Sequence, residues 1–182
     1  MKTDSSISLH SFTPVGDCSL IRFEGRRHNE QFRFTYRIPA QLGEMLDVGR
    51  TSKSPGNRRD ELWRHNCLEF FVGPTGQPTY WEYNFSFGGD WNCYRFDDYR
   101  RGMREEPNAA LFHFESRHAD GAYLIQLNVS APPYDTVWLG APAAVLLLRT
   151  NHSELTPHFF APVHAGDTPD FHHPDSRCIA IE

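Results

Sequence analysis

Groups able to hydrogen-bond a ligand alternate with aromatic residues between Thr79 and Phe96. Glu82, Asn84 and Ser86 fall on every second position, so an extended strand would place them on one face and the aromatic residues on the other. The polar face contains no Lys. Carboxylate, amide and hydroxyl groups in a row are typical of a surface that binds a polar ligand. The pattern therefore favours ligand binding over a chemical reaction.

Tryptophan and polar residues recur together around this segment. Proteins bind sugars by packing the C–H face of the sugar on a flat aromatic ring, while carboxylate, amide and guanidinium groups hydrogen-bond its hydroxyls. The alternative is that the tryptophans belong to the core, and the sequence leaves both interpretations open. For a sugar site we expect stacking on Trp63 or Trp91 and hydroxyl contacts from Glu82, Asn84 and Arg95, with Glu69 as a weaker candidate.

Two carboxylates on neighbouring expected strands, Glu69 and Glu82, leave an enzymatic alternative open. Glycosidases place two carboxyl groups about 5–5.5 or 6.5–9.5 Å apart across a cleft, and a strand pair can hold side chains at such distances. The chain has no Gly-x-Ser-x-Gly elbow and no glycine-rich phosphate loop. We expect a binding protein, with glycosidase-type catalysis as the less favoured function.

Histidine is frequent, with 10 residues in the chain, and His172 and His173 lie between Asp170 and Asp175. Such residue types can ligate a metal ion. Adjacent residues of an extended segment point in opposite directions, however, so these two imidazoles do not readily reach one ion. We expect a structural role in which one His caps backbone groups, and we predict no metal site.

Composition excludes several function classes. The 182 residues carry a formal net charge of -5, so the continuous basic stripe of a nucleic-acid-binding protein is missing. We interpret the pairs Arg58-Arg59 and Arg100-Arg101 as solvated loop charge. No apolar run approaches the roughly 18 residues of a membrane-spanning helix. The first residues lack the pattern of an export signal, so we expect a cytoplasmic protein without a membrane partner.

The four cysteines, Cys18, Cys67, Cys93 and Cys178, form no Cys-x-x-Cys pair. A zinc site of that kind is therefore not indicated. Each lies in or beside an apolar strand pattern, and we expect buried, reduced thiols.

Short strands account for most of the chain. We expect nine or ten of them, with no long amphipathic helix, and a single helical turn within 41–46. Asp120-Gly121 is a strong hairpin signal. Many strands at hairpin spacing predict an all-β antiparallel sandwich or barrel formed by one domain, residues 1–182. The expected strands include 19–24 (followed by a turn at 25–29), 32–38, 67–72, 80–87, 91–96, 111–117, 123–129, 143–150 and 177–181.

Four motifs in this order resemble the bacterial DOMON-like proteins, a group related to the family nine carbohydrate-binding modules of xylanases. The motifs are LWRHNCLEFF at 62–71, YWEYNFS at 80–86, DWNCYRF at 90–96 and PDFHH at 169–173. The resemblance implies a jelly-roll-type β-sandwich that binds a ligand without transforming it. In the wider superfamily that ligand is a sugar or a haem, and family nine modules clamp a sugar between two tryptophans. The matching positions are Trp63, Glu69, Glu82, Asn84, Trp91 and the segment around His172.

The sequence therefore predicts a β-sandwich that binds a small polar ligand, most readily a saccharide or oligosaccharide, without a required cofactor. The runner-up is a haem-binding redox module in which Met45 or Met103 and a His are the axial ligands. Nothing in the sequence selects an oligomeric state.

Overall fold

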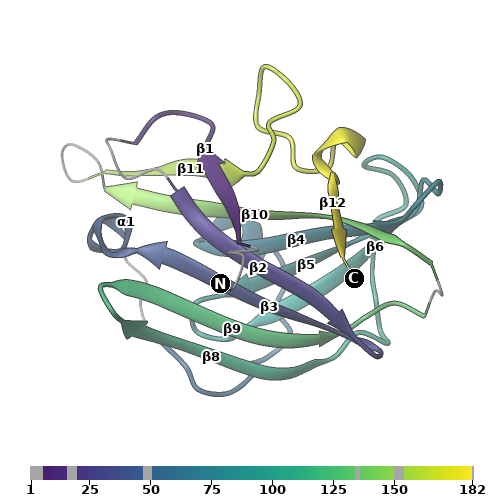
Figure 1. Cartoon of the computed structure of the whole chain (residues 1–182), viewed down its shortest axis with the longest axis horizontal. Helices are drawn as coiled ribbons and strands as arrows, with labels where there is room; N and C mark the ends of the chain where they lie inside the picture. Colours follow the sequence, from purple (N-terminus) through teal and green to yellow (C-terminus); the bar gives the residue numbers. More distant parts are fainter. Residues whose placement is uncertain (1–5, 16–19, 47–50, 134–135, 150–153, 182) are drawn as a thin grey trace, which may run out of the picture.

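The computed structural model describes residues 6–15, 20–46, 51–133, 136–149 and 154–181. Twelve strands form one sheet that folds over on itself, and its two halves lie face to face as two layers (Figure 1). This confirms the predicted all-β antiparallel fold. In sheet order the strands are β7 (Arg104–Glu105), β6 (Trp91–Phe96), β5 (Tyr80–Ser86), β4 (Cys67–Pro74), β10 (Trp138–Arg149), β11 (Leu155–Ala161), β1 (Ile7–Ser11), β2 (Leu20–His28), β3 (Gln31–Pro39), β9 (Ala122–Ser130) and β8 (Leu111–Ala119), and β12 (Ile179–Ile181) pairs with β10.

Helices are few in the described residues. The helix α1 (Ala40–Met45) is a short turn that follows β3, at the position where one helical turn was expected. Two 3-10 turns, η1 (Leu62–Arg64) and η2 (Pro174–Ser176), precede β4 and β12. None of these helices is long and apolar enough to cross a membrane.

The core lies between the two layers. In Figure 1, β2, β3, β9 and β8 lie in front of β4, β5 and β6. Phe70 of β4 joins the layers, since its ring centroid is 4.2 Å from that of Phe34 and 5.7 Å from that of Phe23. Trp81 and Trp138 are sealed in the same core, in edge-to-face contact at 5.8 Å. The inward positions of β4 and β5 are thus filled by apolar residues, which leaves their outward positions for other groups.

One predicted turn is wrong. The segment 25–29 was expected to be a turn because of Gly25, yet β2 continues through it to His28. A Cβ on Gly25 would lie 2.6 Å from the Phe23 ring, so this glycine makes room for core packing. The chain turns instead at Asn29, whose φ is 55°, a left-handed conformation that Asn tolerates better than most residues.

The cysteine prediction is confirmed in part. Cys67 and Cys93 are buried free thiols, whereas Cys178 is free but exposed, contrary to expectation. The alternation that surrounds Cys178 belongs to the short strand β12, which begins one residue later and buries Ile181 instead. Cys18 lies outside the described residues.

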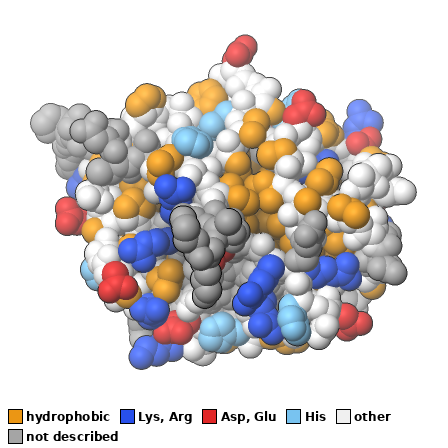
Figure 2. Space-filling view, in the orientation of Figure 1, with side chains coloured by type: hydrophobic (Ala, Val, Ile, Leu, Met, Phe, Trp, Pro, Cys, Tyr) orange, Lys and Arg blue, Asp and Glu red, His pale blue; other side chains and the backbone are white. Residues whose placement is uncertain are grey.

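The outer faces of the two layers differ in charge. Figure 2 shows Lys and Arg side chains gathered over the front layer. There the outward positions of β2 and β3 carry Arg22, Arg26, Arg33 and Arg37. The corresponding positions of β4 and β5 in the other layer carry Glu69 and Glu82.

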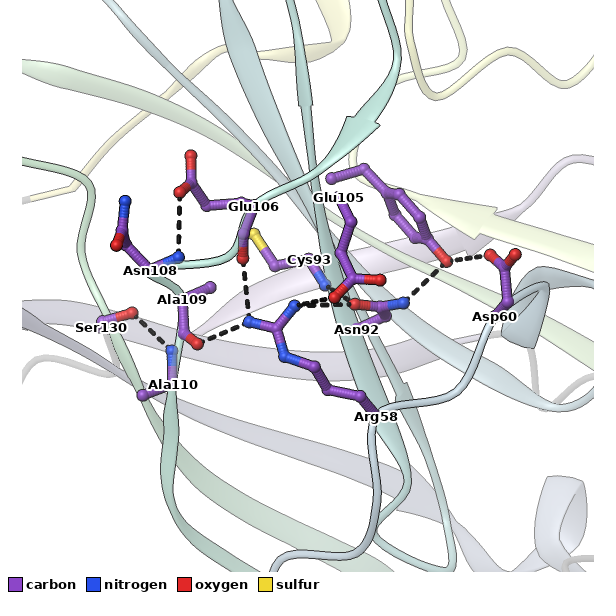
Figure 3. Close-up of polar contacts among 11 residues, drawn as sticks. Arg58, Asp60, Asn92, Cys93, Glu105, Glu106, Asn108, Ala109, Ala110 and Ser130 are labelled. Atoms are coloured by element: carbon purple, nitrogen blue, oxygen red, sulfur yellow. Dashed lines mark hydrogen bonds and ion pairs between the residues drawn. The ribbon is translucent and has the colours of Figure 1, made fainter.

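Arg58 ties the loop before β4 to the rest of the sheet (Figure 3). Its guanidinium donates to Asn92 Oδ1 (3.3 Å), to Glu105 Oε1 (2.7 Å) and to the backbone oxygens of Glu106 and Ala109 (2.9 and 2.6 Å). It also lies 4.5 Å from the centre of the Trp91 ring. The interpretation of Arg58 as solvated loop charge is therefore wrong.

The neighbouring Arg59 gives a matched comparison, because its side chain is 65% exposed against 26% for Arg58. We expect Arg58→Ala to lower the free energy of unfolding by about 2–4 kcal/mol, since it removes four hydrogen bonds and leaves the partly buried oxygen of Ala109 without its donor. Arg59→Ala should cost less than about 0.5 kcal/mol. Urea unfolding monitored by tryptophan fluorescence measures both, and equal losses would contradict the assigned network.

Candidate functional site

A cavity of about 410 Å³ lies on the outer face of β4, β5 and β10, on the side away from the core. This volume is at the small end of the range for small-molecule sites, about 300–1,000 Å³. Phe96 of β6, Phe159 of β11, the 3-10 turn η1 and the loops after β6 and before η2 supply the rest of its wall. Its aromatic side chains are Trp63, Phe71, Phe96, Phe159 and Phe171, and its polar ones are Glu69, Glu82, Arg100 and His172.

Two buried carboxylates lie at the strand side of this cavity. Glu69 is opposite Asn84 in the β4–β5 ladder, and Glu82 is opposite Phe71. The two glutamates are therefore diagonal neighbours on one face, because facing and alternate residues of an antiparallel pair share a face. Glu69 is 3% exposed and Glu82 is 4% exposed. Both carboxyl groups are thus buried, although they line the cavity.

The two carboxyl groups differ in their partners. Glu82 Oε1 accepts a hydrogen bond from Asn84 Nδ2 at 2.7 Å, and Oε2 lies 3.7 Å from His172 Nε2. Glu69 Oε1 is buried and has no partner within the described residues. A buried polar atom without a partner costs about 1–3 kcal/mol. A buried acceptor without a donor at a cavity wall, such as Glu69 Oε1, is a candidate contact for a ligand.

Burial dominates the acid–base properties of the pair. It raises the pKa of Glu82 to about 7, against a usual value of 4.5, although the bond from Asn84 and the charge of Arg100 act in the opposite direction. Burial and the charge of Glu82 raise the pKa of Glu69 well above 4.5. The charged forms are disfavoured because neither carboxylate is well solvated. Near neutral pH the pair therefore retains protons that exposed glutamates would lose.

His172 is neutral in this setting. Burial, followed by the charge of Arg100, lowers its pKa from 6.5 to about 4. Its Nδ1 is 2.8 Å from the Tyr80 hydroxyl, which itself accepts the backbone N–H of Arg100 at 3.2 Å. Burial raises the pKa of Tyr80 to about 12, so Tyr80 keeps its proton and donates it to Nδ1. We accordingly assign the proton of His172 to Nε2, facing Glu82, in a contact that is not an ion pair at neutral pH.

Asp170 fastens the loops at the mouth of the cavity. Its carboxylate accepts the Tyr99 hydroxyl at 2.5 Å, the Arg100 guanidinium at 2.7 Å and the His172 backbone N–H at 3.1 Å. Partial burial would raise the pKa of Asp170, but the bonds from Tyr99 and Arg100 outweigh it and lower the pKa. The loop after β6 and the loop before η2 are thus joined through one charged group.

Four of the predicted site residues line the cavity, namely Trp63, Glu69, Glu82 and His172. Asn84 lies beside them in the same row and orients Glu82. Trp63 is half-buried and makes an edge contact with Tyr94 at 5.5 Å. The structure thus brings these five residues together on one side of the sheet.

Trp91 and Arg95 lie elsewhere. On β6 the residues that share a face with Glu82 are Asn92, Tyr94 and Phe96, so the intervening Trp91 and Arg95 point to the opposite side of the layer. Trp91 is 7% exposed and packs in the core under Arg58. Arg95 lies over Trp81, with its Cζ 5.4 Å from that ring. Of the four tryptophans, all within the described part of the chain, only Trp63 borders the cavity.

Several residues of the site were not expected from the sequence. Arg100 was interpreted as solvated loop charge, yet it lines the cavity. Tyr80 orients His172, and its period-two spacing from Glu82 was a usable signal. Arg100, Asp170 and the wall residues Phe159 and Phe171 are brought together by long-range loop packing, for which no local pattern exists.

The residues do not fit the haem alternative. Met103 and His172 line the same cavity, as an axial pair would require. However, His172 Nδ1 is occupied by Tyr80 and its Nε2 faces Glu82. Met45 instead packs against the core.

Within the described residues, no group of three or more His, Cys, Asp or Glu side chains could hold a metal ion. The capping role expected of a His falls to His173, whose ring accepts the Asp175 N–H at 3.3 Å.

No protein-family model matches the chain, and no curated protein has a matching sequence. Among solved structures, the fold is similar to that of a candidate carbohydrate-binding protein from Bacteroides uniformis. The TM-score is 0.59 at 16% sequence identity, and the match covers 97% of this chain and 87% of that chain. The similarity over nearly the whole chain shows a shared fold.

The pKa shifts of Glu82 and His172 have opposite signs, so they predict opposite effects of pH on stability. The pKa of Glu82 is about 7 in the folded protein and 4.5 in the unfolded chain. The contribution of Glu82 to stability is therefore lost as the pH rises from 4.5 to about 7. The pKa of His172 is about 4 in the folded protein and 6.5 in the unfolded chain. The contribution of His172 to stability is therefore lost as the pH falls from 6.5 to about 4. The two contributions oppose each other between about pH 4.5 and 6.5.

Single variants should therefore separate the two effects. Relative to the unaltered protein, the free energy of unfolding of Glu82→Gln should rise from pH 4.5 to 7, and that of His172→Gln should fall from pH 4 to 6.5. Each change should reach about 2–3 kcal/mol at most. Urea titrations at several pH values provide the measurement. Slopes of the same sign would show that the protonation states are misassigned.

Proposed function

We propose that this protein is a non-catalytic binding domain of the DOMON type whose cavity holds a small saccharide or a similar polyhydroxylated molecule. The observation that carries the proposal is the buried, unpartnered Oε1 of Glu69 beside an open cavity with aromatic walls. A hydroxyl or other donor of a ligand would supply the missing hydrogen bond. The similarity in fold to a candidate carbohydrate-binding protein is consistent with this role.

Each part of the cavity has a function in such a complex. Glu69 and Glu82 accept hydrogen bonds from ligand donors, and Arg100 contributes its remaining N–H groups. Trp63, Phe159 and Phe171 meet the C–H faces of the ligand. A stack on one ring is worth about 1–3 kcal/mol by analogy with bases on aromatic residues. Micromolar affinity needs about 8 kcal/mol, so several hydrogen bonds must act together with the stack.

Glycosidase-type catalysis is the second candidate, because both carboxyl groups lie on one cavity and the pKa of Glu82 is about 7. A general acid in such enzymes also has a raised pKa. Assays for released reducing sugar separate the two functions. A Glu82→Gln variant that still binds but no longer turns over a saccharide would establish the enzyme.

Trp63 allows a direct test of binding. In calorimetric titrations with mono- and disaccharides, we expect Trp63→Ala to weaken binding at least about tenfold, which corresponds to about 1.4 kcal/mol of lost stacking. Phe112→Ala is the matched control, since Phe112 is 55% exposed on β8 and lies outside the cavity. It should leave the affinity unchanged. Absence of binding by the unaltered, folded protein at millimolar concentrations of the whole panel would refute the saccharide proposal.

A further inference from the structure

The cavity presents two carboxyl groups without a matching cation. Within the described residues, no basic side chain forms an ion pair with Glu69. The basic group beside Glu82 is His172, which is neutral above about pH 4. Isolated carboxylates are rarely buried, because their charged form loses its hydration. Glu69 nevertheless has one buried oxygen, Oε1, without a hydrogen-bond partner in the described part of the chain.

The other charges around the cavity are already neutralised or engaged. Arg100 binds Asp170 at 2.7 Å, and its charge only partly offsets the effect of burial on the pKa of Glu82. Arg177 lies over the Tyr80 ring at 4.6 Å and donates to the His172 backbone oxygen at 3.3 Å. The phenol of Tyr80 keeps its proton, since its pKa is about 12. Among the described residues, the two glutamates on β4 and β5 are therefore the acidic groups of this cavity without an ion-pair partner at neutral pH.

Aromatic rings surround this acidic pair. Trp63, Phe71 and Phe171 line the same cavity, and aromatic faces attract cations when water is excluded. A primary ammonium group has three N–H donors and a full positive charge. It can satisfy Glu69 Oε1 and compensate Glu82 at the same time. A neutral hydroxyl can satisfy the acceptor, but it leaves the protons of the two carboxyl groups in place.

We propose that the ligand is an amino sugar or a similar amine-bearing polyol whose ammonium group binds between Glu69 and Glu82. The inference rests on the proposed function and specifies the chemistry of its ligand. In the absence of the ligand, protons on the two carboxyl groups take the place of the missing cation, as the raised pKa values of both indicate. The ammonium group displaces such a proton into solution when it binds.

Three sugars that differ at a single carbon test the inference. Glucose carries a hydroxyl group there, glucosamine an ammonium group, and N-acetylglucosamine a neutral amide. We expect calorimetry at pH 7 to give glucosamine at least about tenfold higher affinity than either neutral sugar. Glu69→Gln should reduce this preference severalfold, since it removes one of the two acidic groups. Glu115→Gln, on β8 and outside the cavity, should preserve the preference.

The outcomes distinguish the two proposals. Equal affinity for glucose and glucosamine, or an unchanged preference in Glu69→Gln, would overturn the ammonium site and leave the saccharide function standing. Binding of 1,5-diaminopentane when every sugar fails would support the ammonium site and refute the saccharide function. Absence of binding by all four compounds would overturn both the ammonium site and the saccharide function.

Discussion

The alternation of residues along β4 and β5 is the constraint on which the site depends. One face of these strands carries Leu68, Phe70, Trp81 and Tyr83, which fill the core between the layers. The packing of this face fixes the register, because a slip of one residue would exchange the two faces. Glu69 and Glu82 consequently have no freedom to turn toward open solvent. Core packing thus fixes both carboxyl groups on the outer face, where the residues that wall the cavity bury them.

Tyr36 links the two layers at Glu69. It extends from β3 across the core and donates to the backbone oxygen of Glu69 at 2.7 Å. The backbone that carries the unpartnered carboxyl group is therefore held by the opposite layer. On the outer side, Asn84 holds Glu82, and Tyr80 holds His172. Oε1 of Glu69 differs from its neighbours in this row, because it is buried without a hydrogen-bond partner among the described residues, and buried atoms of this kind are found at functional sites.

The sequence contained enough information for the fold class and for part of the site. Period-two alternation placed Glu82 and Asn84 on one face and Trp81 on the other, as the structure has them. The same rule, applied through β6, would have assigned Trp91 and Arg95 to the core side. They were chosen instead for their residue types and for a resemblance. Spacing was the better guide here because it follows from strand geometry, whereas residue type does not.

Other features depend on contacts that no local pattern records. The interrupted pairing of β10 is an example, since its partner on one side changes from β12 at Gly140 to β11 at Ala144. Pro142 lies between these two ladders, but the pairing with β4 on the other side continues through it, so the strand expected to begin at 143 begins at Trp138. Likewise, Arg58 and Arg100 each belong to an Arg-Arg pair in the sequence. Arg58 is enclosed by the segment 104–110, and Arg100 binds Asp170, which lies 70 positions later in the chain.

The central claim is that the cavity beside Glu69 and Glu82 receives the ligand. Carboxyl ¹³C chemical shifts, followed by NMR while glucosamine is added, test this directly. We predict that the Glu69 and Glu82 signals move together as the protein becomes saturated with glucosamine, whereas the Glu115 signal on β8 stays in place. Saturation by the ligand without movement of the Glu69 and Glu82 signals would contradict it.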